Sequence, residues 1–387
     1  MSRMTLSRRS ALRHFGVGAV MTALPSMAQA ARLPSSSAAA GRESDGRRGP
    51  IRLDLTGNCR GPSPRAIAAM QDALGTVLRS DEELARLREA IARHHRVEPS
   101  QIVLGCGSGE ILRMAAASFT GPGKTLVVAD PTCHLVTQYA VRSGARVVSV
   151  PLRANYAHNL SAMAGAIDGA TGLVYICNPN NPTGTLTRRQ DLEAFLRRIP
   201  GTPVIVIDEA YHDYVEPTPD TVSFLDLPFD DERLMIVRSF SKLHGMDGMR
   251  VGYAVTTSRL ASLAGYSALE NNVNVIAARG AAAALADDAY VRHSVDLTSN
   301  ERQEFVNQAY ARMLPNIESV SNFVMLDTLR QVGRVLDFFR GHDIVLAPPV
   351  PPPFDTHIRV SLGTPSEIQE FWRVWDLMPI PPKTHRM

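Results

Sequence analysis

Seven short apolar segments, separated by turns and helical stretches, constrain the fold of this chain more than any other feature. They are rich in β-branched residues and begin near residues 102, 125, 145, 172, 203, 234 and 250. Stretches with helical patterns lie between several of them, at 111–119, 134–144 and 188–199. Apolar strands that alternate with helices indicate a parallel sheet covered on both faces. We therefore predict an α/β fold in which a mostly parallel, seven-stranded sheet lies between helices.

Other parts of the chain predict the surroundings of this sheet. Residues 81–95 form an amphipathic helix pattern, for which Asp81 is the expected N-cap. The chain after residue 258 is alanine-rich and helical to about 314, and shorter strand and helix patterns follow. PPVPPPF at 348–354 must be a loop, because proline lacks the donor that a strand needs.

These patterns predict a large domain and a small α+β domain built from both chain ends. The predicted boundaries are 50–80 for an N-terminal arm and part of the small domain, 81–285 for the large domain, and 286–387 for the C-terminal small domain. The chain of 387 residues is long enough for this arrangement.

The first thirty residues have the pattern of an export signal. Arg8 and Arg9 precede a modest apolar stretch, and Ala28, Gln29 and Ala30 form a small-x-small cleavage pattern. We expect a twin-arginine (Tat-type) signal peptide at 1–30, a linker at 31–49, and a periplasmic or exported protein that uses the Tat export machinery. A disordered basic tail is the alternative, and the protein would then be cytoplasmic.

Composition excludes several classes of partner. The net charge is +3, the charged fraction is 20%, and no basic block indicates nucleic-acid binding. After the leader no apolar run is long enough to span a bilayer, so we expect no stable membrane anchor. The four cysteines show neither a CxxC pair nor metal-ligand spacing, and we expect no metal site. Whether any cysteine pair is oxidised stays open.

Four loops that follow predicted strands carry the chemistry of the chain. In open α/β sheets, ligands bind beyond the carboxyl ends of the strands. The four loops are GCGSGE at 105–110, NPNNPTG at 178–184, DEAYHDY at 208–214 and SFSKLHGMDGMRVGY at 239–253. The first offers backbone amides at a helix start, which favours an anion. The third places Asp208 at the end of a buried strand, where a carboxylate needs a cation or a donor.

In this order and spacing, the four loops resemble those of the class I and II aminotransferases. These are fold type I pyridoxal-phosphate enzymes, and the resemblance spans roughly residues 50–380. GPSP, DEELARLREAIA, GMDGMRVGY and HIRVSLGT are most similar to the histidinol-phosphate aminotransferase branch. The resemblance implies a transaminase that moves an amino group between an amino acid, or an amino-acid-like phosphate, and a 2-oxo acid. It also implies a homodimer with its active sites at the interface.

The same resemblance implies roles for particular residues. Lys242 would hold pyridoxal 5'-phosphate as a Schiff base and then transfer the substrate proton. Asp208 would pair with the pyridine nitrogen, and Tyr211 and Asn181 would hydrogen-bond the ring's 3-oxygen. Arg359 would bind the substrate carboxylate, with Asn181 beside it. The cofactor phosphate would be held by Ser108, Gly109, Ser239, Ser241 and Arg250.

The chain departs from the family pattern at four places. Arg79 stands where members have a tyrosine that reaches the partner subunit's phosphate. We expect either that Arg79 takes over this contact or that it faces solvent in a shortened loop. Either Cys133 or His134 stands where an aromatic residue stacks on the ring. Residues 57–60 replace an Asn-Glu-Asn-Pro pattern, and Ala347 replaces a substrate-binding arginine. The amino donor and acceptor, including histidinol phosphate, therefore stay open.

Two other functions remain compatible with the sequence. A decarboxylase or lyase similar to threonine-phosphate decarboxylase would use the same cofactor and the same lysine. The choice of which Cα bond breaks depends on substrate contacts that the sequence does not show. A non-catalytic module that binds pyridoxal phosphate is the second alternative.

Overall fold

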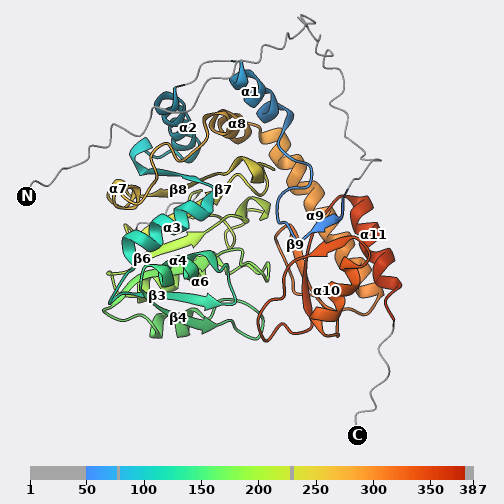
Figure 1. Cartoon of the computed structure of the whole chain (residues 1–387). Helices are drawn as coiled ribbons and strands as arrows, with labels where there is room; N and C mark the ends of the chain where they lie inside the picture. Colours follow the sequence, from blue (N-terminus) through green and yellow to red (C-terminus); the bar gives the residue numbers. More distant parts are fainter. Residues whose placement is uncertain (1–48, 76–78, 227–230, 380–387) are drawn as a thin grey trace, which may run out of the picture. The chain divides into compact units, whose positions relative to one another are not determined.

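A seven-stranded sheet is the main element of the computed structural model, which describes residues 49–75, 79–226 and 231–379. All seven expected strands are present: β2 (Ile102–Cys106), β3 (Thr125–Asp130), β4 (Arg146–Pro151), β5 (Thr171–Cys177), β6 (Val204–Asp208), β7 (Leu234–Ser239) and β8 (Val251–Thr256). Their spatial order is β2-β8-β7-β6-β5-β3-β4 (Figure 1). Strand β8 is antiparallel to both of its neighbours, and the other pairs are parallel. The predicted α/β fold with a mostly parallel sheet is confirmed.

Helices cover both faces of this sheet. Successive strand residues point to opposite sides, and both sides are apolar here. On one face, Leu126 and Val128 pack in a buried cluster with helices α3 (Ser108–Phe119), α4 (Leu135–Arg142) and α7 (Ser258–Gly265). On the other face, Val127 and Ala129 of the same strand pack with α5 (Leu160–Gly165) and α6 (Arg189–Arg198).

Three further helices pack against the β2–β8 edge of the sheet. They are α1 (Pro64–Leu74), α2 (Ser80–His95) and α8 (Val275–Leu285), and their apolar residues form one cluster with Leu104 and Val255. Helix α1 was not predicted, although Ser63 and Pro64 are typical of a helix start. The Ser63 hydroxyl accepts the Ala66 amide at 3.1 Å.

The start of α2 differs from the prediction. The N-cap is Arg79, and the expectation that Asp81 is the N-cap is wrong. Asp81, Glu82 and Glu83 instead occupy the first turn. Carboxylates stabilise that turn because the helix dipole is positive there.

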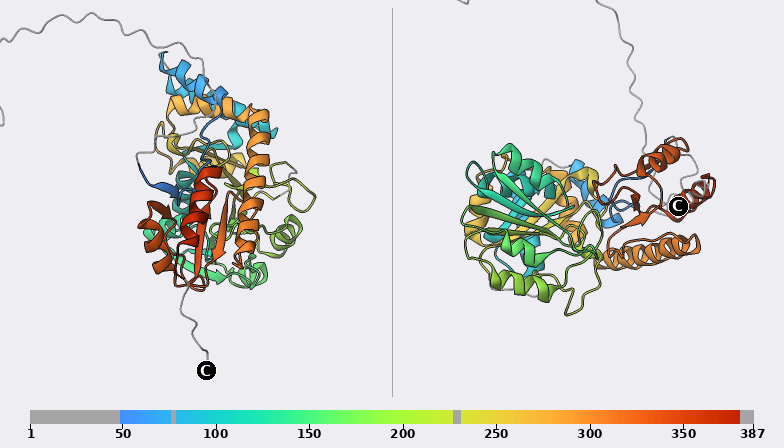
Figure 2. Two further views of the ribbon diagram at one scale, coloured as in Figure 1. Left: turned by 90° about the vertical axis from the view of Figure 1, so that its right-hand side faces the viewer. Right: turned by 90° about the horizontal axis from the view of Figure 1, so that it is seen from below.

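A smaller α+β unit is built from both ends of the described chain. Strand β9 (Phe323–Asp327) pairs antiparallel with β11 (His357–Ser361), and β1 (Ile51–Leu53) pairs parallel with β10 (Ile344–Leu346). Helices α9 (Asp288–Ala311), α10 (Val332–Arg340) and α11 (Pro365–Asp376) supply the three phenylalanines that centre its core: Phe305, Phe339 and Phe371. Figure 2 shows these elements beside the main sheet.

Two remaining expectations concern loops and leader. Residues 348–354 have no helix or strand, as their prolines require. The expected signal peptide at 1–30 lies outside the described residues, as does nearly all of the expected linker. Within the described part of the chain, no helix combines the length and the apolar character that a membrane span needs.

Candidate active site

A cavity of about 600 Å³ lies at the carboxyl ends of the parallel strands. Arg359 reaches it from β11 of the smaller unit, so both units build its walls. The structure thereby brings together residues that are far apart in the chain. Its lining includes six of the residues predicted from the sequence: Ser108, Asn181, Asp208, Tyr211, Lys242 and Arg359.

A chain of hydrogen bonds connects Lys242 with Arg359 across the cavity. Lys242 Nζ donates to Thr56 Oγ1 at 2.6 Å, and Thr56 Oγ1 lies 3.0 Å from the Tyr211 hydroxyl. Asn181 Nδ2 donates to the same hydroxyl at 3.2 Å. Arg359 Nη1 donates to Asn181 Oδ1 at 2.8 Å. The positions of Asn181, Tyr211 and Lys242 are therefore mutually dependent.

Thr56 is a site residue that sequence reasoning missed. It directly precedes the segment 57–60, so a hydroxyl beside that unusual segment was the available signal. Asn322 Nδ2 donates to the Thr56 carbonyl at 3.0 Å, and Asn58 Nδ2 donates to the Leu243 carbonyl at 2.9 Å. The Asn58 bond holds the N-terminal segment against the lysine loop, and the Asn322 bond holds it against the residue before β9.

Asp208 is a buried carboxylate at the end of β6. Its Oδ2 accepts the Tyr175 hydroxyl at 2.8 Å, and its Oδ1 accepts the Ala210 amide at 3.1 Å. Burial raises the pKa of the Asp208 carboxyl, and Tyr175, Ala210 and Lys242 act in the opposite direction. Its two hydrogen-bond partners are neutral donors, so the carboxylate can stabilise a positive N–H group in the cavity.

The start of α3 forms a cradle at the place where the sequence predicts an anion site. The helix begins at Ser108 after Gly107, whose φ is 75°. The first amides of a helix, here those of Ser108 and Gly109, have no intrahelical acceptor. A Cβ at Gly107 would lie 2.1 Å from Arg250 Nη2, so the guanidinium packs directly over this turn.

Two serines of the lysine loop extend this cradle. Arg250 Nη1 donates to Ser241 Oγ at 3.3 Å and to the Asp247 carbonyl at 2.9 Å. The Ser241 amide donates to Ser239 Oγ at 3.2 Å. Four of the predicted phosphate-binding residues are not among the residues that line the cavity: Gly109, Ser239, Ser241 and Arg250. Gly109 is next to the lining residue Ser108 in the chain, and Ser241 is next to Lys242.

Comparison with known proteins identifies the family. Residues 53–374 match the family model described as aminotransferase class I and II. The chain belongs to the class I and II aminotransferases. A histidinol-phosphate aminotransferase of Moorella thermoacetica is 35% identical over 326 residues, which are 84% of each chain. One of Methylobacillus flagellatus is 36% identical over 326 residues, covering 84% of this chain and 87% of the relative.

Solved structures agree with this assignment. Histidinol-phosphate aminotransferase from Sinorhizobium meliloti, solved in complex with pyridoxal 5'-phosphate, superposes with a TM-score of 0.78 at 25% identity. The match covers 86% of this chain and 93% of that one. The activity class and cofactor expected from the sequence are thereby confirmed: the protein is a pyridoxal-phosphate-dependent aminotransferase.

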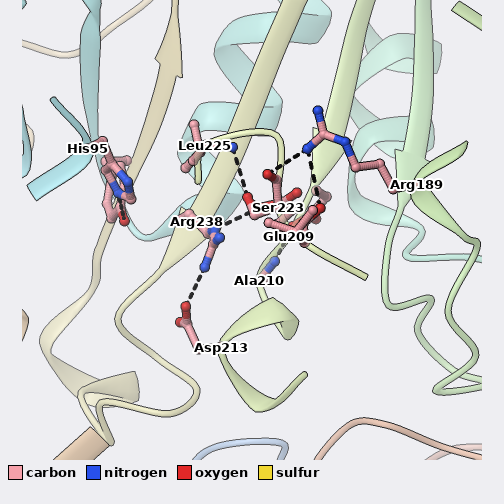
Figure 3. Close-up of polar contacts among 11 residues, drawn as sticks. His95, Arg189, Glu209, Ala210, Asp213, Ser223, Leu225 and Arg238 are labelled. Atoms are coloured by element: carbon pink, nitrogen blue, oxygen red, sulfur yellow. Dashed lines mark hydrogen bonds and ion pairs between the residues drawn. The ribbon is translucent and has the colours of Figure 1, made fainter. Parts of the chain in front are cut away.

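A buried ionic network of the aminotransferase braces the segment 208–214, and sequence reasoning missed it (Figure 3). Arg238 Nε donates to Glu209 Oε2 at 2.9 Å, and the Ser223 hydroxyl donates to the same oxygen at 2.6 Å. Arg238 also pairs with Asp213. Because Glu209 directly follows Asp208, these bonds fix the backbone that presents Asp208 and Tyr211.

Some residues at which the aminotransferase departs from the family pattern line the cavity, and Arg79 does not. Cys133 and His134 both line the cavity, and Ala347 lies in its wall. Burial raises the pKa of the Cys133 thiol, which favours its neutral form.

The exposed Arg79 pairs with Glu82, with Nε and Oε1 3.4 Å apart, and does not line the cavity. All four cysteines are free, and no cluster among the described residues could hold a metal ion.

Proposed function

We propose that this cavity is the active site of the aminotransferase and that Lys242 is its cofactor-bearing amine and its base. One observation carries the proposal: Lys242, Asp208 and Arg359 line the same cavity although they come from different elements. These three side chains supply an amine, a buried carboxylate and a guanidinium. Amino-group transfer needs all three functions, for the cofactor aldehyde, the cofactor ring and the substrate carboxylate.

The residues present fit pyridoxal phosphate. The α3 N-terminus, Ser241 and Arg250 would hold the phosphate, in the cradle that a Cβ at Gly107 would fill. Asp208 would hold the pyridine N–H, and its buried position makes such a partner favourable. When bound, the cofactor supplies an aldehyde that reacts with amines and a conjugated ring that accepts the electron pair released at Cα.

Two further polar groups suit the edge of the cofactor ring. The Tyr211 hydroxyl and Asn181 Nδ2 would donate to the 3-oxygen, and they already lie 3.2 Å from each other. Ser239 supports Ser241 from behind through the backbone amide. Ser108 and Gly109 add the first amides of α3 to the phosphate site.

Arg359 would position the substrate for Lys242. Two of its donors are used by Asn181 Oδ1 and by the Asp54 carbonyl, each at 2.8 Å, so the guanidinium is held rigidly. Its other donors can take an α-carboxylate. A substrate held there by its carboxylate would lie in the cavity that Lys242 also lines.

Lys242 Nζ would then act as the proton carrier. In the first half-reaction it would move the proton from the Cα of the amino donor to the carbon that was the cofactor's aldehyde carbon. In the second half-reaction it would move a proton from that carbon to the Cα of the new amino acid. Thr56 Oγ1, 2.6 Å from Nζ, keeps the amine in the cavity while the proton moves. The amine thus serves both half-reactions from one position.

The chain offers a sharp test because it contains three lysines, Lys124, Lys242 and Lys383. Borohydride reduction of the cofactor-loaded protein, followed by peptide mapping, should label Lys242 alone. Lys242→Ala should abolish turnover and the cofactor's visible absorbance while the protein stays folded. Lys124→Ala is the matched control, because this exposed lysine directly precedes β3 and does not line the cavity, and it should keep both signals. Labelling of another lysine would refute the assignment.

We also propose that the aminotransferase works as a homodimer. The proposal rests on the resemblance to the class I and II family, which implies a homodimer with its active sites at the interface. In such a dimer, the exposed Arg79 would reach toward the partner's phosphate site. Sedimentation of the cofactor-loaded protein tests the dimer. A monomer with full activity would overturn it.

Export through the Tat machinery is the last part of the proposal. Its support is the leader itself, with Arg8 and Arg9 before an apolar stretch and a small-x-small pattern at 28–30. Replacing both arginines by lysine should keep the protein in the cytoplasm with its leader uncleaved. Equal export of the double variant would show that the leader is not a Tat signal.

A further inference from the structure

One wall of the active-site cavity is made of apolar residues from a single loop. Ala347, Pro348, Pro349, Val350 and Pro351 follow β10 and line the cavity that also holds Lys242 and Arg359. Proline has no backbone N–H, so this stretch offers few donors to a polar or anionic ligand. It does offer continuous apolar surface, which suits aliphatic or aromatic groups.

The wall is held in place from behind. Val350 packs with Phe354 and Tyr156 on a small cluster that contains Ile317 and Met325. The Phe354 and Tyr156 ring centres are 5.5 Å apart, and Phe354 is almost fully buried. The loop therefore presents a defined surface to the cavity.

The charges of the cavity lining also favour a ligand group that is apolar rather than anionic. Its described lining includes the cations Lys242 and Arg359, the carboxylates Asp130 and Asp208, and His134. On the proposed function, Lys242 and Asp208 serve the cofactor and Arg359 holds the substrate's α-carboxylate. No second guanidinium lies among the described lining residues, whereas Asp130 would repel a further anion.

We propose that the side chain of the amino donor lies against the wall 347–351 and that the preferred donors are amino acids with one carboxylate and an apolar side chain. This inference rests on the proposed function of Lys242 and Arg359 and adds the substrate class. Donors with a second anion, either a side-chain carboxylate or a phosphate, lose the apolar contact. They also meet Asp130 without a compensating cation.

Binding without turnover is the first test. Amino acids with a methyl group on Cα have no proton to lose there, so their spectral titration of the loaded enzyme reports affinity alone. We expect 2-methylleucine and 2-methylphenylalanine to bind at least tenfold more tightly than 2-methylaspartate and 2-methylglutamate. Equal or tighter binding of the acidic analogues would overturn the proposal. The same result would follow if a second subunit supplied the missing cation, and it would overturn the proposal in that case too.

Single-turnover rates are the second test. The second-order rate constants for leucine and phenylalanine should exceed those for aspartate and glutamate at least tenfold. A preference for histidinol phosphate or an acidic donor would overturn the substrate class. If no donor reacts, the proposed function fails, and the order of affinities among the methylated analogues still decides the substrate class. Absence of binding by every apolar analogue overturns both.

A pair of variants at one position isolates the role of the wall. Pro349 is exposed and lines the cavity. Pro349→Arg should shift the rate ratio of aspartate to leucine at least tenfold toward aspartate, because it adds the missing cation. Pro349→Ala removes the ring without adding charge and should leave that ratio within about threefold of wild type. An unchanged ratio in Pro349→Arg would show that the donor side chain lies elsewhere.

Discussion

The Tyr175 hydroxyl donates a hydrogen bond of 2.8 Å to Asp208 Oδ2, and both side chains are buried. Tyr175 lies on β5 and Asp208 ends β6, so neighbouring parallel strands make this contact. Burial raises the pKa of Tyr175 well above its usual range, which keeps the phenol protonated and able to donate. Tyr175 is therefore a positioning residue for Asp208, the carboxylate that we propose holds the cofactor ring.

Removing the Tyr175 hydroxyl should slow the reaction without loss of the bound cofactor. Tyr175→Phe leaves Asp208 Oδ2 without its buried donor, which costs about 1–3 kcal/mol. We expect kcat to fall roughly tenfold with little change in KM. We also expect the pH dependence of the cofactor's absorbance to shift. Tyr253→Phe is the control, because that buried hydroxyl pairs with His95 and does not line the cavity, and it should leave the absorbance profile unchanged.

Replacing Asp208 itself should have a larger effect. Asp208→Asn keeps the size of the side chain but removes the negative charge that would stabilise the pyridine N–H. We expect the protein to retain cofactor while the rate of Cα proton removal falls on the order of 100-fold. A single-turnover measurement with an amino donor gives this rate directly. A rate near that of the wild type would contradict the role of Asp208.

Arg359 should discriminate substrates by their carboxylate. Arg359→Ala should weaken binding of α-amino acids by about 1.5–3 kcal/mol, because a charged hydrogen-bond donor is lost. Arg359→Lys keeps the charge but loses the fork geometry, so it should recover only part of the affinity. A simple alkylamine is the internal control, because it has no carboxylate and should bind all three proteins equally. An unchanged KM for amino acids in Arg359→Ala would place Arg359 outside the substrate site.

Two glycines with similar backbone angles test the phosphate cradle. Gly107 and Gly123 have φ values of 75° and 76°. A Cβ at Gly107 would lie 2.1 Å from Arg250 Nη2, whereas a Cβ at Gly123 would meet nothing within 4 Å. Replacement by alanine therefore causes similar backbone strain at both positions, but only Gly107→Ala displaces the Arg250 guanidinium. We expect Gly107→Ala to raise the cofactor dissociation constant roughly tenfold, and Gly123→Ala to leave it unchanged. Equal dissociation constants for the two variants would contradict the cradle.

Stability should fall in mild acid because of a buried histidine. His158 is 2% exposed, and burial lowers its pKa from 6.5 to about 4. The unfolded chain therefore binds a proton at His158 before the folded one does. The stability that neutral His158 contributes is present above pH 6.5 and is lost as the pH falls toward 4. The loss is about 2 kcal/mol at pH 5.

Denaturant unfolding at pH 7.5 and pH 5 measures this loss. His158→Gln should show a smaller difference in unfolding free energy between the two pH values than the wild type. His293→Gln, at an exposed position on α9, should match the wild type. If His158→Gln keeps the full difference, other groups are responsible for the acid sensitivity.

The seven strands could be predicted from the sequence because both of their faces are buried. Burial on both sides requires continuous apolar segments, and those are visible without a structure. The meeting of Asp208, Asn181 and Lys242 at one cavity could be expected too, because each lies at or after the end of a strand in a loop of distinctive composition. In both cases, a short stretch of sequence is sufficient to show the strand or the loop, because each depends on neighbouring residues only. Helix α1 was missed although Ser63 and Pro64 form a helix-start pattern. The N-cap of α2 was misplaced by two residues because Arg79 makes no side-chain capping bond, and a local pattern does not fix a helix boundary to the residue.

Tertiary structure alone decided the contacts between distant segments. Thr56 reaches Lys242 across 186 positions of the chain, and Arg359 reaches Asn181 across 178. Thr56 had only its place beside the segment 57–60 as a local signal, and Tyr175 had none, because their partners are set by how the strands and the two units pack. The proline wall is similar: its sequence required a loop, but only the fold turned that loop toward the cavity. The sequence by itself thus determined the elements and the reactive groups, and packing decided which of those groups meet.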